Sequence, residues 1–352
     1  MLLARAGVGR GRQVTRGVRR ASFCLRQRPS LMRDFLIDTD TASDDAVAIL
    51  MALAAPDVRV RGLTTVAGNV DVEQATQNAL LTAEIAGSDV PVFKGAAAPL
   101  TRSLADARWF HGGDGLSDRN GPPPRGAAER EHAVDAIRRI VEAAPGLTLV
   151  TLGPLTNVAL ALARDPGLAG KIGRCVVMGG APCCEGNVTP AAEYNIWVDP
   201  EAARIVFRSG LPIEMVGWHV SRGASVLNEA EIADILALGT AKARFAIECN
   251  ARAKQAYHVQ TGEAGLSLAD PTAMAVALDR AIGLSWSRHV VEIECASELT
   301  RGMTIVDRLN VAADDNNRQT WSAALKSGAK ADVCWTFDSA CFKAMLKRAL
   351  AT

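Results

Sequence analysis

Four aspartates lie within eight positions of the stretch FLIDTDTASDDAVAIL, residues 35–50: Asp38, Asp40, Asp44 and Asp45. Like charges at this density repel one another, so the cluster is costly unless positive charge lies nearby. The second pair opens a helical pattern, and a helix N-terminus offsets part of the repulsion. The remainder predicts a hard cation, because the stretch offers carboxylate oxygens without histidine or cysteine. A solvated, capped helix start would explain Asp44 and one neighbour, but not Asp40 together with Asp45.

The elements that must position these aspartates alternate along the chain. Strand-like apolar segments run over 34–38, 58–66, 147–152, 173–178 and 213–217, and helical patterns over 44–55, 71–86, 129–144, 154–164 and 199–209. This alternation predicts a single α/β domain, an open and mostly parallel sheet with helices on both faces and a Rossmann-like core. In such sheets ligands bind beyond the carboxyl ends of the strands, where Asp38 and Asp40 stand. The helical stretch 228–260 is expected to pack outside the sheet, near the site.

Charge is distributed unevenly along the 352 residues. Residues 1–31 hold eight arginines and no acid, and without them 31 basic residues face 38 acidic ones, a formal net charge of −7. This acidic body argues against nucleic acid as a partner. We expect 1–31 to be a disordered or non-native basic extension, because it lacks a hydrophobic period, and 32–352 to be the folded domain. A transit peptide and a nucleic-acid-binding arm remain alternatives for the extension.

The cysteines and the apolar segments bear on where the chain works. The eight cysteines include no CxxC pair and no Cys/His spacing suited to zinc. No apolar run approaches the roughly 18 residues of a membrane-spanning helix, and no secretory signal with an apolar core is present. Reduced thiols, a cytoplasmic location and no membrane partner are therefore expected.

Several motifs in series resemble one enzyme family. The segment DTDTASDDAVA at 38–48 resembles the signature of the inosine–uridine-preferring nucleoside hydrolases, and further matches follow in the family's order. They are TTVAGN at 64–69, HGGDGLS at 111–117, LGPLTNVALAL at 152–162, MGG at 178–180, GNVTPAAEYNIWVDPEAA at 186–203 and ADPTAMA at 269–275. The resemblance covers about residues 33–350, and so many independent motifs make it specific.

The resemblance implies a Ca²⁺ ion at the carboxyl edge of the sheet and hydrolysis of the N-glycosidic bond of ribonucleosides. By position, Asp40, Asp45 and Asp270 resemble the carboxylate ligands, and Leu152 supplies a backbone carbonyl where the family usually has threonine. Asp38 is expected to shape the turn beneath them. Cleavage of a ribosyl C–N bond passes through an oxocarbenium-like state, and a carboxylate beside an activated water takes its proton. Asp40 is the expected general base.

The sugar must be held by its hydroxyl groups, a task suited to carboxylate and amide side chains. Five residues are assigned to it by the resemblance: Asp44 and Asn195 to the 2′- and 3′-hydroxyls, Asn69 close by, and Asn187 and Glu193 to the 5′-hydroxyl. Each also has a structural interpretation. Asn187 follows a glycine and could be a turn residue, Glu193 could cap a helix, and Asn69 could satisfy a loop.

One position departs from the family. Base-nonspecific members usually carry histidine immediately before the metal-binding aspartate, where this chain has Ala269 before Asp270. That histidine is thought to protonate the departing base, and alanine cannot. Tyr257 and His258 are the nearest substitutes by sequence, although a helix end with a solvated histidine explains them equally well. Stacking of the base on Trp109, Trp197 or Trp218 is a further alternative, and we expect a narrowed or shifted base preference.

Two other functions remain to be weighed against a ribonucleoside hydrolase. The pentapeptide IDTDT also fits a Mg²⁺-dependent phosphohydrolase of the haloacid dehalogenase type, but GNVTPAAEYN has no place in that class. A catalytically impaired nucleoside or sugar binder is the second alternative. The family resemblance further suggests a homodimer or homotetramer.

Overall fold

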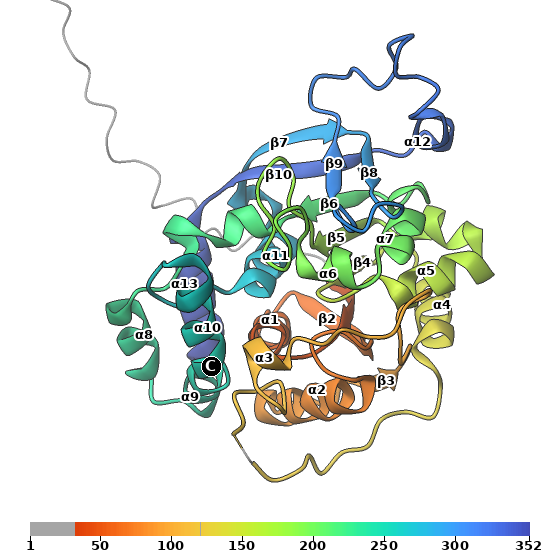
Figure 1. Ribbon diagram of the computed structural model, residues 1–352. Helices are drawn as coiled ribbons and strands as arrows, with labels where there is room; N and C mark the ends of the chain where they lie inside the picture. Colours follow the sequence, from red (N-terminus) through yellow and green to blue (C-terminus); the bar gives the residue numbers. More distant parts are fainter. Residues whose placement is uncertain (1–31, 120) are drawn as a thin grey trace, which may run out of the picture. The chain divides into compact units, whose positions relative to one another are not determined.

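The computed structural model describes residues 32–119 and 121–352, so the expected basic extension 1–31 lies outside the described residues. Its centre is an eight-stranded sheet in the order β3-β2-β1-β4-β5-β6-β10-β7 (Figure 1). In that order the strands are β3 Val92–Lys94, β2 Val58–Thr65, β1 Arg33–Thr39, β4 Thr148–Thr151, β5 Arg174–Met178, β6 Ile213–Val216, β10 Ala331–Phe337 and β7 Gly283–His289. A separate antiparallel pair joins β8 Val291–Ile293 and β9 Thr304–Val306.

All neighbouring strands of the large sheet are parallel except β7, which runs antiparallel to β10 at one edge. The mostly parallel sheet predicted by the strand–helix alternation is therefore confirmed. Five of its strands, β1, β2, β4, β5 and β6, begin and end within about two residues of the apolar segments that predict them. The carboxyl ends of the parallel strands consequently meet along one edge.

The helices form layers on both faces of the sheet (Figure 1). They are α1 Ser43–Leu53, α2 Val72–Ala86, α3 Arg108–His111, α4 Ala133–Ala143, α5 Thr156–Arg164, α6 Tyr194–Val198, α7 Pro200–Phe207, α8 Glu229–Leu236, α9 Ala241–Glu248, α10 Ala251–Thr261, α11 Ala269–Leu278, α12 Ser322–Ser327 and α13 Ser339–Leu350. The stretch expected to pack outside the sheet forms α8, α9 and α10.

Successive side chains of β1 point alternately into two hydrophobic cores, one on each face of the sheet. Phe35 and Ile37 pack with residues of α1, α11 and α13, whereas Leu36 packs with residues of α4, α5 and α7. This is the period of two that a strand covered on both faces imposes. Both faces are therefore closed to solvent, and the open edge at the carboxyl ends is left for a ligand.

No helix of the described ranges 32–119 and 121–352 combines the length and the apolarity needed to cross a bilayer.

Candidate active site

The site begins where β1 gives way to α1. Asp38 lies at the end of β1, Asp40 follows it, and Asp44 and Asp45 occupy the first turn of α1. A second buried helix, α11, starts at the same edge and carries Asp270 in its first turn. The positive ends of two helix dipoles thus point at one group of carboxylates, and they offset part of its negative charge.

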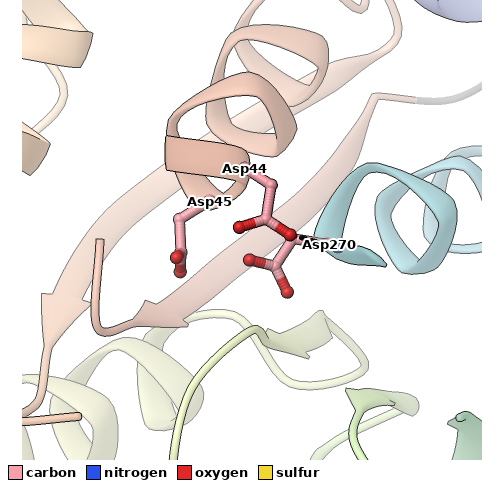
Figure 2. Close-up of side chains that lie close together, drawn as sticks. All are labelled: Asp44, Asp45 and Asp270. Atoms are coloured by element: carbon pink, nitrogen blue, oxygen red, sulfur yellow. Dashed lines mark hydrogen bonds between the residues drawn. The ribbon is translucent and has the colours of Figure 1, made fainter. Parts of the chain in front are cut away.

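Three of these carboxylates come close together. Ligand oxygens of Asp44, Asp45 and Asp270 all lie within 4.8 Å of one another, and Figure 2 shows them projecting from the facing ends of α1 and α11. The backbone N–H of Asp270 also donates to Asp44 Oδ2 at 3.4 Å. An oxygen-only group of this size is a site at which a metal ion can be held.

Asp40 is enclosed by backbone on two sides. Its Oδ2 accepts a hydrogen bond from the Asn69 N–H at 2.7 Å, while its buried Oδ1 has no partner. Two glycines make room for the carboxylate: a Cβ at Gly68 would lie 2.1 Å from Oδ2, and one at Gly153 would lie 2.6 Å from Oδ1. The neighbouring loops therefore fit closely around Asp40, and one oxygen is left without a partner.

Asp45 is held firmly in place. Thr39 Oγ1 donates to its Oδ1 at 2.6 Å, and the N–H of Ala42 donates to Oδ2 at 3.0 Å. Asn69 adds a side-chain hydrogen bond to Oδ2 at 3.3 Å. Asn69 thus contacts both Asp40 and Asp45, which suits a residue that orders the carboxylates as well as a residue that satisfies a loop.

Burial and mutual repulsion raise the pKa of these carboxyl groups. Burial raises the pKa of Asp45 to about 6, and the charge of Asp44 adds to the effect. The pKa values of Asp40 and Asp270 lie well above the usual range, first because of burial and then because of the charge of Asp45. A cation would reverse this balance, since it favours the ionised forms.

The donor set fits a hard metal ion. It consists of buried carboxylates, an unpartnered oxygen on Asp40 and no nitrogen or sulfur ligand. The three closest carboxylates include Asp44, whereas the resemblance implies Asp40 in its place. Asp40 is nevertheless near the group, because the charges of Asp45 and Asp44 contribute to raising its pKa. The carbonyl of Leu152, the fourth expected ligand, accepts a hydrogen bond from Asn195 Nδ2 at 2.7 Å and retains a second lone pair.

Asp38 lies beneath this group rather than in it. Its Oδ1 accepts hydrogen bonds from Thr64 Oγ1 at 2.5 Å and Asn157 Nδ2 at 2.9 Å. Burial raises its pKa to about 7 against the effect of both bonds. Asn157 also donates to the Thr65 carbonyl, so it ties β1 to the end of β2. The hydrogen bonds of Asp38 thus come from β2 and α5, while its buried Oδ2 has no partner.

A cavity of about 710 Å³, including the space at its open mouth, lies above the carboxylates. Its lining includes all five residues assigned to the ribose together with two of the expected metal ligands: Asp44, Asn69, Asn187, Glu193, Asn195, Leu152 and Asp270. The structure thus brings together around one cavity residues that are scattered over more than two hundred positions.

Glu193 and Asn187 have structural contacts as well. The Glu193 side chain caps α6 by accepting hydrogen bonds from the N–H groups of Asn195 and Ile196, and it also accepts one from Gly180 at 2.7 Å. Asn187 Oδ1 accepts a hydrogen bond from the Tyr194 N–H at 2.9 Å. Both residues therefore fill their structural role and line the cavity at the same time.

The two candidate leaving-group acids occupy different surroundings. His258 is exposed and lies outside the cavity lining, with Nδ1 against the carbonyl of Glu263 at 3.1 Å. Tyr257 lines the cavity, but its hydroxyl donates to the carboxylate of Glu263, and burial raises its pKa to about 12. Neither environment favours release of a proton to a base in the cavity.

The structure places three further residues in the cavity lining, of which Trp218 was considered from the sequence for stacking on the base. His111 is buried, pairs through Nδ1 with Ser43 Oγ at 2.6 Å and has its pKa lowered by burial. Trp218 Nε1 and Asn250 Oδ1 are buried without a partner, and both residues line the cavity. The sequence signal for His111 was its place in the HGGDGLS motif, and Asn250 had none.

Comparison with known proteins gives consistent results. The model of the inosine-uridine preferring nucleoside hydrolase family matches residues 35–344. Uridine nucleosidase 1 of Arabidopsis thaliana is 40% identical over 279 residues, 78% of this chain and 81% of that protein. The pyrimidine-specific ribonucleoside hydrolase RihA of Shewanella sp. (strain MR-7) is 40% identical over 291 residues, 82% of this chain and 90% of that protein.

Solved structures show the same fold. The plant nucleoside hydrolase PpNRh1 superposes with a TM-score of 0.84 at 31% identity, covering 91% of this chain and 99% of its own. The purine-preferring ribonucleoside hydrolase from Gardnerella vaginalis gives a TM-score of 0.81 at 31% identity, with 91% and 98% covered.

These matches settle the choice among the three functions. A phosphohydrolase would not share a family model, a fold and about 40% identity with nucleoside-cleaving enzymes over most of its length. The chain is a ribonucleoside hydrolase rather than a mere binder, and its carboxylates could hold a metal ion. It belongs to the inosine–uridine-preferring nucleoside hydrolase family.

Proposed function

We propose that this hydrolase holds Ca²⁺ with Asp40, Asp45, Asp270 and the Leu152 carbonyl, and that Asp40 is the general base. The observation that carries the proposal is the unpartnered, buried Oδ1 of Asp40 beside a group of oxygen-only ligands. Asp44 lines the cavity together with the other four residues assigned to the ribose, which supports a role for Asp44 on the sugar. When bound, the calcium ion supplies Lewis-acid activation of the attacking water.

The remaining steps fall to the chain's own residues. Asp40 accepts the proton of the water, and the hydrogen bond from the Asn69 N–H keeps its carboxylate oriented. Asp44 and Asn195 hold the 2′- and 3′-hydroxyls, and Asn187 and Glu193 hold the 5′-hydroxyl. The amide of Asn195 is itself fixed by the carbonyls of Leu152 and Met178, so the sugar-binding group is preorganised.

The base is proposed to lie against the aromatic side chains of the cavity. Trp109, Phe110, Trp218 and Tyr257 line it, and their faces suit a stacked heterocycle. His111 also lines the cavity, and burial lowers its pKa. Its Nδ1 is engaged by Ser43 Oγ, so Nε2 is the ring nitrogen that remains to contact the base.

Uridine is the natural substrate we propose first, because relatives at about 40% identity are named as uridine nucleosidase and as pyrimidine-specific ribonucleoside hydrolase. A purine-preferring relative at 31% identity makes inosine the substrate to compare. We also propose that the protein is a cytoplasmic homodimer or homotetramer, and that residues 32–352 contain everything needed for activity.

Because position 269 lacks a histidine, the rate of hydrolysis is expected to depend strongly on whether the leaving group needs a proton. p-Nitrophenyl riboside needs no protonation of its leaving group, so its kcat/KM is expected to exceed that of inosine by about 100-fold or more. The substitution Ala269→His places an imidazole in the cavity lining and is expected to raise the inosine or uridine rate about 10-fold. Steady-state kinetics on the three substrates provide the measurement.

The nitrophenyl substrate is the internal control for that substitution, because its rate should be unaffected by an added acid. Equal rates on all three substrates, unchanged by Ala269→His, would show that an intact proton donor exists elsewhere in the site.

Recognition of the 5′-hydroxyl can be tested from the substrate side. Uridine is expected to be cleaved about 10- to 100-fold more efficiently than 5′-deoxyuridine, because hydrogen bonds to charged groups contribute about 1.5–3 kcal/mol. In Asn187→Ala and Glu193→Gln the difference between the two substrates should shrink. The ratio is more informative than either rate, since Glu193 also caps α6. If wild type cleaved both nucleosides equally well, the assignment would be wrong.

A further inference from the structure

The far end of the helix that carries Asp270 is held by two arginines from the sheet. The last bond of the α11 ladder runs from the Asp279 N–H to the Ala275 carbonyl. The three carbonyl groups after it are those of Val276, Ala277 and Leu278. A helix end leaves such carbonyls without partners inside the helix. No basic residue lies in the last turn of α11 to satisfy them.

Arg174, the first residue of β5, donates to two of these carbonyls. Its Nη1 bonds to the carbonyl of Ala277 at 3.0 Å and its Nη2 to that of Val276 at 3.2 Å. The same guanidinium is oriented by Glu214, which accepts from Nη2 at 2.7 Å. Arg174 therefore connects the start of β5 to the end of α11 with a rigid, planar group.

Arg33, the first residue of β1, completes the set. Its Nη1 donates to the carbonyl of Leu278 at 2.9 Å and approaches that of Ala277 at 3.4 Å. Asp57 orients this guanidinium in turn, at 2.6 Å from Nη2. The strand that ends beside Asp40 is thus tied, at its beginning, to the helix that begins with Asp270.

These contacts bear directly on the carboxylate group. Asp270 lies in the first turn of this 10-residue helix, about 9–12 Å along the axis from the carbonyls of residues 276–278. α11 packs against α1, which carries Asp44 and Asp45, so a shift of α11 along its axis would move Asp270 relative to these carboxylates. Metal ligands tolerate displacements of only about 0.2 Å, so the axial position of the helix matters for binding.

We propose that Arg33 and Arg174 are positioning residues for the metal site: they set the axial position of α11 and thereby place Asp270 against Asp45. The inference rests on the proposed function, because it requires a cation at the carboxylates. Neither arginine touches the cavity lining, so both act at a distance.

The test is the affinity of the purified full chain for Ca²⁺, measured by calorimetry well below the unfolding temperature. Arg33→Met and Arg174→Met keep the apolar stem and remove the guanidinium. Each is expected to weaken Ca²⁺ binding about 10-fold or more, and kcat should return towards the wild-type value at saturating Ca²⁺. Arg174→Lys keeps the charge and one donor, and it should restore part of the affinity.

Arg280→Met is the matched control. Arg280 contacts the same Glu214 at 3.0 Å and also Asp332, and neither of these contacts involves a carbonyl of α11, so its loss should leave Ca²⁺ affinity unchanged. Wild-type affinity in both methionine variants, or an equal loss in the control, would overturn the inference. If Arg174→Met does not fold, Arg33→Met and Arg174→Lys still decide it. Failure of the wild type to bind Ca²⁺ would instead contradict the proposed function.

Discussion

Replacing Asp40 with asparagine is expected to lower kcat on uridine by about 10³-fold while KM changes little. An amide keeps the shape of the carboxylate and can still accept the hydrogen bond from the Asn69 N–H. It cannot accept a proton from the attacking water, and general-base catalysis contributes about 10²- to 10⁴-fold. The loss should therefore appear in the chemical step and not in binding, as steady-state kinetics will show.

Asp38→Asn is the matched comparison, because Asp38 is two residues away and equally buried. Its hydrogen bonds come from Thr64 and Asn157, and it does not line the cavity. This variant should lose stability more than turnover. Wild-type turnover in Asp40→Asn, or a greater loss of turnover in Asp38→Asn, would remove Asp40 from the role of base.

Loss of the metal is expected to be the second large effect. Asp45→Ala removes a carboxylate held by Thr39 and Ala42, and it should weaken Ca²⁺ binding at least about 100-fold and reduce hydrolysis to near background. The fold should survive, since the substitution also removes a repelling charge. Calorimetry and circular dichroism separate the two outcomes. The control is Asp34→Ala, at the other end of β1, where the carboxylate pairs with Arg59.

Chelation of the wild-type protein should have the same effect on activity, and full activity after exhaustive chelation would contradict the metal assignment. It should also change how stability depends on pH. In the metal-free protein burial raises the pKa of Asp45 to about 6 from the ordinary aspartate value of 3.8. The folded state then keeps a proton that the unfolded chain has lost, so this stabilising contribution is full below about pH 4 and is lost as the pH rises through about 6. The increase in melting temperature caused by Ca²⁺ should therefore grow from pH 5 to pH 8.

Most of the sheet could be predicted from sequence because its central strands are covered on both faces. Their apolar runs are continuous, and Asp or Gly residues mark where the flanking helices begin and end. The edge strand β7 has mainly exposed or half-buried side chains, so its sequence contains no apolar run that would predict a strand. Its partner β10 lies more than forty residues further along the chain. Pairing at that distance is decided by tertiary packing and not by local pattern.

The same distinction separates the predicted from the unforeseen parts of the site. Asp38, Asp40, Asp44 and Asp45 could be recognised because their chemistry is concentrated in one short segment. His111 acquires its position through Ser43, 68 residues earlier, and Asn250 through the Ser43 carbonyl, 207 residues earlier. An isolated histidine or asparagine carries no local sign of such a contact.

The order of strands in the sheet also determines when the site can form during synthesis. β6 pairs with β10, and the more than one hundred residues between them include α11 and its Asp270. Pairing of strands so far apart in sequence is slow, because the loop between them loses conformational entropy before the contact forms. At about 5–20 residues per second, a ribosome needs roughly 10–45 s to progress from Asp45 to Asp270. Throughout that interval the nascent chain lacks Asp270, so we expect the carboxylate group to form only after α11 has been made and has packed against α1 and α13.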